Sequence, residues 1–376
     1  MRKLLSLILI SIIPLVSFGQ KKLLVIKANS SKVAIKDGDY LDKNAWSLSP
    51  ETKPDIYTAD RSSKPKWVVF YTDIDSIKVK VKPGTIFDFI ILLNGKDTCY
   101  TRIVSSKAYE KDAVKSEIFP DTIPFKLNNF DAIQVQSIVN NSDTLNLHFD
   151  LGTLDFRFTK PAFSKIRQKK IDKIQMGKCH WDAPNVQIAN NASHGMDGRF
   201  GWRAFDGKIV EINYDKNILV VHSKLPKIEK GYFRSNIKFI QSLLCIEAAI
   251  QIDQKNYIGN FLVDTGSDLA MVLDSAWLVE QHFPENQKVI RKSSFSDGAG
   301  RKYETTIISI PQVSLNRFKL KNVPTSKLGF KSPVGSQINY FGNELLKRFN
   351  MIIDLQKDSI YLKSNTLFSS PYKEKI

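Results

Sequence analysis

The chain has 376 residues, of which 42% are hydrophobic, and 55 Lys and Arg against 38 Asp and Glu give a formal net charge of +17. Its length allows several domains, and its hydrophobic content is typical of a folded protein. The basic residues are spread along the chain without a long basic block, zinc-finger spacing or aromatic RNA-binding signature. Nucleic acid is therefore not expected as a partner.

The first residues have the pattern of a secretory signal peptide. Arg2 and Lys3 precede an apolar run from Leu4 to Val16, which is too short to span a membrane, and small residues follow. We expect residues 1–19 to be removed and the mature protein to be periplasmic or extracellular. No later stretch reaches the length of a membrane span, so none is expected, and the positive charge would face anionic envelope polymers.

Residues 20–119 are expected to form a small β domain such as a sandwich. Short apolar or alternating runs are separated by turn residues, and the strictest alternation is Ile-Lys-Val-Lys-Val-Lys at 77–82. We find no cluster of catalytic residue types in this part. A polar stretch containing Pro120 marks a linker to the remainder of the chain.

The next part of the chain contains a duplication. Both Ile123 to Asp150 and Ile237 to Asp264 cover 27 steps without a gap, opening with Ile-x-Phe and ending in a strand that delivers an aspartate. Each aspartate has a glycine two places later. The spacing predicts two related lobes at 120–225 and 226–366, followed by a tail at 367–376.

The second half of each repeat matches as well, because Phe200-Gly201 and Phe341-Gly342 are each followed, eleven residues after the glycine, by a strand beginning with isoleucine. This arrangement, with Asp-Thr-Gly-Ser at 264–267, resembles the lobes of pepsin-like and retropepsin-like aspartic peptidases. The resemblance covers about residues 120–365. It implies an all-β fold in which two pseudo-symmetric retropepsin-like lobes, fused in one chain of the exported bacterial type, follow the small β domain.

The resemblance implies that Asp150 and Asp264 form a catalytic dyad that shares one proton and activates water to hydrolyse peptide bonds. It implies no metal and no cofactor, a peptide or protein substrate, and a monomer, since one chain supplies both lobes. The residues that would support the dyad are Gly152, Thr153, Gly201, Thr265, Gly266, Ser267 and Gly342.

A glycine-rich segment in the second lobe is a candidate flap over the substrate. Its tip contains Ser296, Asp297, Gly298 and Gly300, between two extended arms. Glycine would give such a hairpin mobility. A plain surface hairpin is the alternative.

Two residues depart from the pattern of the family. Leu151 replaces the threonine that would make a cross-lobe hydroxyl bond, and Arg199 stands where an apolar residue precedes Phe-Gly. A guanidinium that reached the dyad would keep both acids ionised, whereas an outward-pointing one would be harmless. Two alternatives therefore remain: an inactive peptidase-like protein that binds extended peptides, and an envelope-binding protein that acts through the N-terminal β domain.

Three of the five histidines, and the three cysteines, are the remaining candidates for reactive side chains. His148, His180 and His194 lack metal-ligand spacing, so structural roles are expected, although strand alternation puts His148 on the face of Asp150. The cysteines, whose disulfide state the sequence leaves open, are too few for a disulfide framework or a zinc site: Cys99, Cys179 and Cys245.

Overall fold

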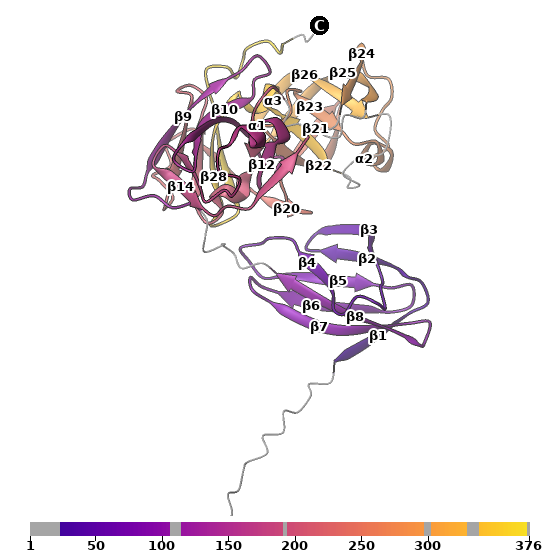
Figure 1. Cartoon of the computed structure of the whole chain (residues 1–376). Helices are drawn as coiled ribbons and strands as arrows, with labels where there is room; N and C mark the ends of the chain where they lie inside the picture. The colour runs from indigo at the N-terminus through magenta and orange to yellow at the C-terminus, as the bar shows by residue number, and fades with distance from the viewer. Residues whose placement is uncertain (1–22, 106–113, 191–193, 297–301, 329–337, 374–376) are drawn as a thin grey trace, which may run out of the picture.

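Figure 1 shows the computed structural model, which describes residues 23–105, 114–190, 194–296, 302–328 and 338–373. The expected signal peptide lies outside these ranges. Within them, no helix has both the length and the apolar character needed to cross a membrane. The three cysteines are buried and do not form disulfides.

The N-terminal part is a β sandwich with a core of its own. One sheet has the strand order β1-β7-β8-β4 and the other β3-β2-β5-β6. The alternation at 77–82 explains the inner face of β6, because its isoleucine and valines are buried and its lysines exposed. The strands are β1 (Leu24–Ala28), β2 (Lys32–Asp37), β3 (Tyr40–Ser47), β4 (Asp55–Ala59), β5 (Lys66–Tyr71), β6 (Ser76–Val81), β7 (Ile86–Leu93) and β8 (Asp97–Ser105).

The first lobe is almost entirely β structure. Its helix α1 begins at Lys160, because the Thr159 side chain caps it and a proline lies in its first turn. The elements are β9 (Asp121–Leu127), β10 (Ile133–Val139), β11 (Asp143–Phe149), β12 (Phe156–Thr159), α1 (Lys160–Lys165), β13 (Lys173–Met176), β14 (Cys179–Asp182), β15 (Val186–Ala189), β16 (Gly198–Phe200), the 3-10 helix η1 (Trp202–Phe205), β17 (Ile209–Asn213) and β18 (Ile218–His222).

The second lobe repeats this order with longer strands. Its elements are β19 (Phe233–Asn236), β20 (Lys238–Ile240), β21 (Leu243–Ile252), β22 (Lys255–Asp264), β23 (Met271–Leu273), α2 (Ser275–Glu280), β24 (Val289–Ser296), β25 (Lys302–Leu315), β26 (Phe318–Leu328), β27 (Asn339–Gly342), α3 (Asn343–Leu346), β28 (Phe349–Asp354) and β29 (Ser359–Ser364).

The two lobes have the same strand connections. In lobe one, β11 is antiparallel to β10 and parallel to β16, while β12 is antiparallel to β16 and parallel to β15. In lobe two, β22 is antiparallel to β21 and parallel to β27, while β23 is antiparallel to β27 and parallel to β26. The predicted fold class, all-β with two related lobes after a small β domain, is confirmed.

A shared sheet joins the lobes. Its strands run in the order β9-β18-β17-β28-β29-β19, so the closing hairpin of each lobe meets the other at the antiparallel pair β17–β28. The cores of both lobes merge into one hydrophobic cluster across this junction. The junction therefore holds the ends of β11 and β22 in a fixed relation.

Buried polar contacts attach the sandwich to the lobes. Arg61 Nε donates to Asp206 Oδ1 at 3.0 Å, and the same guanidinium pairs with Asp358. The carboxylate of Asp60 accepts a hydrogen bond from Gln241 N at 2.8 Å. The sandwich lies on one side of the two lobes (Figure 1).

Candidate active site

Two aspartates meet at the lobe junction. Asp150 follows β11 and Asp264 ends β22, and the backbone of Gly152 lies beside the carboxyl groups of both. A Cβ at Gly152 would lie 2.5 Å from Asp264 Oδ1, and one at Gly266 would lie 2.4 Å from Asp150 Oδ1. Only glycine leaves room for this approach, so each loop packs against the carboxyl group of the other lobe.

The loops also hold their own carboxyl groups. Gly152 N donates to Asp150 Oδ1 at 2.9 Å, and Gly266 N donates to Asp264 Oδ1 at 3.0 Å. The hydroxyl of Thr153 donates to Asp150 Oδ2 at 2.9 Å. The hydroxyl of Ser267, which was expected to bond Asp264, accepts a hydrogen bond from the backbone of its own loop at 3.3 Å instead.

Behind the dyad, two further glycines allow the loops to close. A Cβ at Gly201 would lie 1.8 Å from Thr153 O, and one at Gly342 would lie 2.1 Å from Leu269 O. The aromatic residues preceding these glycines stack on the strands that deliver the aspartates. These packing contacts explain the repeated Phe-Gly pairs: the ring centroids are 5.0 Å apart for Phe149–Phe200 and 4.4 Å for Phe261–Phe341.

Lobe two reaches lobe one through a hydroxyl group. Thr265 Oγ1 accepts a hydrogen bond from Leu151 N at 2.9 Å and donates one to Phe149 O at 2.9 Å. Leu151 has no hydroxyl group that could make the equivalent two hydrogen bonds to lobe two, and its side chain is buried among apolar residues. The cross-lobe exchange is therefore present in one direction.

Two histidines of lobe one supply additional cross-lobe bonds. His148 Nε2 lies 3.1 Å from Thr265 O, and His194 Nε2 lies 2.9 Å from Gly266 O. Because a carbonyl oxygen only accepts, both Nε2 atoms donate. These two bonds attach the Asp264 loop to lobe one, the lobe that lacks a hydroxyl group at residue 151. His180 lies elsewhere, 3.9 Å from Asp182.

The electrostatic environment raises the pKa of Asp264. Burial, followed by the nearby charge of Asp150, raises the pKa of Asp264 from 3.8 to about 8, while the Gly266 N–H and Arg199 oppose this. Burial lowers the pKa of His148 to about 4, so its imidazole is neutral over most of the pH range. Asp264 therefore keeps its proton well above the pH at which an ordinary aspartate loses it.

Arg199 reaches the dyad from lobe one. Its Nη1 lies 3.4 Å from Asp150 Oδ2. The guanidinium therefore reaches the dyad, the arrangement in which it was expected to favour ionised acids. It lowers the pKa of Asp264, but burial and the charge of Asp150 raise that pKa by more.

The candidate flap is described only in part, and the sequence predicted no metal site. Ser296 is the last residue of β24, in the hairpin formed with β25, whereas Asp297, Gly298 and Gly300 lie outside the described residues. No group of three or more His, Cys, Asp or Glu residues in the described ranges could hold a metal ion.

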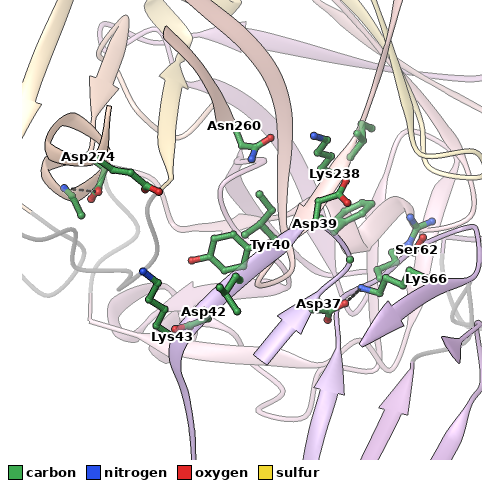
Figure 2. A pocket seen from close by; sticks show the side chains of 18 of the residues that line it. Asp37, Asp39, Tyr40, Asp42, Lys43, Ser62, Lys66, Lys238, Asn260 and Asp274 are labelled. Atoms are coloured by element: carbon green, nitrogen blue, oxygen red, sulfur yellow. Dashed lines mark hydrogen bonds and ion pairs between the residues drawn. The ribbon is translucent and has the colours of Figure 1, made fainter. Parts of the chain in front are cut away.

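One large cavity lies away from the dyad. It has a volume of about 1010 Å³ and separates the sandwich from lobe two, where Tyr40 and Lys43 face Asn260 and Asp274 (Figure 2). The two aspartates do not line it. This cavity therefore belongs to the interface between the sandwich and lobe two.

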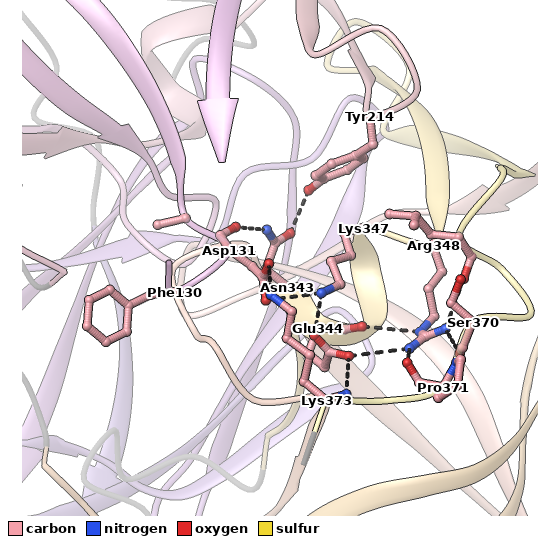
Figure 3. A network of polar contacts seen from close by, with 12 residues as sticks. Phe130, Asp131, Tyr214, Asn343, Glu344, Lys347, Arg348, Ser370, Pro371 and Lys373 are labelled. Carbon is pink, nitrogen blue, oxygen red and sulfur yellow. Dashed lines mark hydrogen bonds and ion pairs between the residues drawn. The ribbon is translucent and has the colours of Figure 1, made fainter. Parts of the chain in front are cut away.

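A buried ionic network joins the two lobes (Figure 3). Lys347 Nζ lies 3.0 Å from Asp131 Oδ2 of lobe one and also pairs with Glu344. From the C-terminal tail, Lys373 Nζ approaches the other oxygen of Asp131 at 2.6 Å. Arg348 lies over the ring of Tyr372, so the predicted tail packs against lobe two.

Comparison with solved structures finds a likeness to an aspartic proteinase. The chain is similar to the crystal structure of aspartic proteinase from Irpex lacteus, with a TM-score of 0.46 and 12% sequence identity, over 69% of this chain and all of that one. No family model matches the sequence, and neither does any curated protein.

Sequence reasoning missed two features of the site. It did not predict the bond from His194 to the Asp264 loop, because it gave no reason to expect that loop near this residue. It also did not single out Arg157, which pairs in register with Arg199 on the neighbouring strand. The motif Arg-Phe at 157–158 and 199–200 was the available signal for this pair.

Proposed function

We propose that this protein is an exported aspartic endopeptidase that hydrolyses peptide bonds with Asp150 and Asp264. The observation that carries the proposal is the approach of the two carboxyl groups at the lobe junction, where each lies against the glycine of the other loop, with a raised pKa on Asp264. Two carboxyl groups that share one proton can act together as acid and base. The N-terminal pattern of residues 1–19 supports a periplasmic or extracellular location.

The proposed reaction uses the two acids in different roles. The carboxylate of Asp150 accepts a proton from a water molecule, whose oxygen attacks the peptide carbonyl carbon while Asp264 donates its proton to the carbonyl oxygen. In the resulting tetrahedral intermediate, Asp150 passes the proton that it took from water to the amide nitrogen. Asp264 takes back a proton from one hydroxyl of the intermediate, and the C–N bond breaks. The backbone N–H groups of Gly152 and Gly266 orient the two carboxyl groups during both steps.

The contact between Arg199 and Asp150 favours a second candidate, a peptide-binding protein without catalytic activity. A guanidinium 3.4 Å from Asp150 Oδ2 would compete with a water molecule for this carboxylate. Peptides would then bind in the cleft without being cleaved.

The N-terminal sandwich offers a surface for a third role, the binding of anionic envelope polymers. Trp67 and Tyr71 on β5 are 45% and 41% exposed. Lys78 Nζ lies 4.6 Å from the centroid of the Trp67 ring, and Lys80 Nζ lies 5.9 Å from it. This basic and aromatic face could attach the peptidase to its surroundings.

The deciding experiment compares the mature protein with its Asp150→Asn and Asp264→Asn variants on a diverse peptide pool at neutral pH, with products identified by mass spectrometry. An aspartic peptidase predicts cleavage that both substitutions abolish. Cleavage that persists in Asp150→Asn would contradict the dyad mechanism. Retention of peptides without cleavage would support the inactive peptide-binding protein.

A further inference from the structure

A row of polar side chains crosses the sheet of lobe one next to Asp150. The parallel pairing of β11 and β16 aligns His148 with Arg199, and the antiparallel pairing of β16 and β12 aligns Arg199 with Arg157. Aligned residues on neighbouring strands share one face of a sheet. Asp150 lies two residues beyond His148, so its carboxyl group is on the same face.

This row contains polar atoms that lack partners. The buried N–H groups at Arg199 Nε and Arg157 Nε have no hydrogen-bond partner in the described parts of the chain, and neither does His148 Nδ1, which is an acceptor because Nε2 carries the proton. His148 itself is only 1% exposed. Buried donors without partners are costly, and two guanidinium groups on adjacent strands repel each other. An anionic group bound beside them would relieve both costs.

Lobe two shows that the fold does not require this basic row. There, Leu262 is aligned with Tyr340, and Tyr340 with Val272, through the same strand pairings. These positions correspond to those of His148, Arg199 and Arg157. Leu262 and Val272 are 7% and 0% exposed, so this row packs as part of the core. The two arginines are thus specific to lobe one.

We propose that Arg199 and Arg157 bind a carboxylate of the substrate beside the scissile bond. This inference rests on the proposed peptidase function and names its substrate class, peptides that carry an acidic group next to the cleavage site. A planar guanidinium offers parallel N–H donors that match the two oxygens of a carboxylate. Asp150 already occupies one side of Arg199, so Arg157 supplies the second positive charge that the substrate needs.

The carboxylate can come from an Asp or Glu side chain or from a free C-terminus, and peptide pools distinguish these sources. Degenerate octapeptide pools carry either Glu or Gln fixed at each position in turn, with a free or an amidated C-terminus. We expect roughly ten- to hundredfold faster cleavage with Glu than with Gln at one position next to the cleaved bond. Faster cleavage of the free than of the amidated peptides, without a difference between Glu and Gln, assigns the site to the C-terminal carboxylate instead.

Reversing one charge gives a test with a positive result. In Arg157→Glu, we expect the preferred residue at that position to change from Glu to Lys or Arg. The matched control is Arg167→Glu, because Arg167 is an exposed lobe-one arginine that pairs with Asp143, away from the dyad. The control should keep the preference for Glu. Unchanged preference in Arg157→Glu would overturn the proposal.

Failure of this proposal can be told from failure of the peptidase function. If the Glu and Gln pools are cleaved equally, with free and with amidated C-termini, and Asp264→Asn abolishes cleavage, the protein is a peptidase and the carboxylate site is refuted. If no pool is cleaved, retention of the same pools on the immobilised protein decides. Stronger retention of the Glu pool that Arg157→Glu removes supports the site, and equal retention of both pools overturns it.

Discussion

The raised pKa of Asp264 makes the stability of the protein depend on pH. In the folded protein this carboxyl group keeps its proton up to about pH 8, whereas in the unfolded chain it loses it near 3.8. Between these values the unfolded chain binds fewer protons, so the free energy of unfolding falls as pH rises. At about 1.4 kcal/mol for each pH unit, the upper limit is on the order of 6 kcal/mol over this window.

Asp264→Asn should remove this dependence, because the amide is a neutral group of the same size. We expect the free energy of unfolding of the variant, minus that of the wild type, to increase from pH 5 to pH 8 and to change little above it. Urea unfolding followed by circular dichroism at half-unit pH steps measures this difference. The control is Asp253→Asn in the exposed turn between β21 and β22. Parallel curves for wild type and Asp264→Asn across this range would refute the assigned proton.

Three further variants test the lobe contacts by the same unfolding measurement. Leu151→Thr introduces a hydroxyl group that can make the reciprocal cross-lobe hydrogen bond. This variant should be more stable than the wild type by no more than about 1 kcal/mol. Lys347→Met removes the buried ammonium shared by Asp131 and Glu344 and should cost about 3–5 kcal/mol, whereas Lys373→Met, whose side chain is half exposed, should cost less than about 1 kcal/mol. Arg61→Ala should cost about 3–5 kcal/mol, because the buried Asp206 and the partly buried Asp358 lose this ionic partner.

Each of these expectations has a clear contrary result. A strongly destabilised Leu151→Thr would mean that the apolar packing of this side chain outweighs the hydroxyl bond. Equal losses for the two lysine variants would mean that burial does not determine the strength of the ionic network. An unfolding transition of Arg61→Ala that matches the wild type would show that the contact between the sandwich and the lobes contributes little.

The sequence predicted the two lobes because the duplication is local and free of gaps. The glycines near Asp150 and Asp264 recur at fixed spacing since each avoids a specific steric clash, and such constraints are visible in the chain itself. Strand alternation likewise placed His148 on the face of the nearby aspartate. These features depend on neighbours within one repeat.

What the sequence did not predict depends on contacts between distant segments. The bond from His194 to Gly266 crosses the lobe junction, and the pairing of Arg157 with Arg199 depends on strand register. The burial of Lys347 against Asp131 likewise joins segments far apart in the chain. No spacing rule in one sequence specifies such contacts, because they follow from how the completed sheets pack.

The central claim, that Asp150 and Asp264 act as a singly protonated catalytic pair, is tested most directly by the pH dependence of kcat/KM on one cleaved peptide. The account predicts activity at neutral pH that falls as pH rises through about 8, when Asp264 loses its proton. The alkaline decline should have the slope of one ionisation. Activity that is confined to pH values below 5, or that persists undiminished at pH 10, would contradict the account.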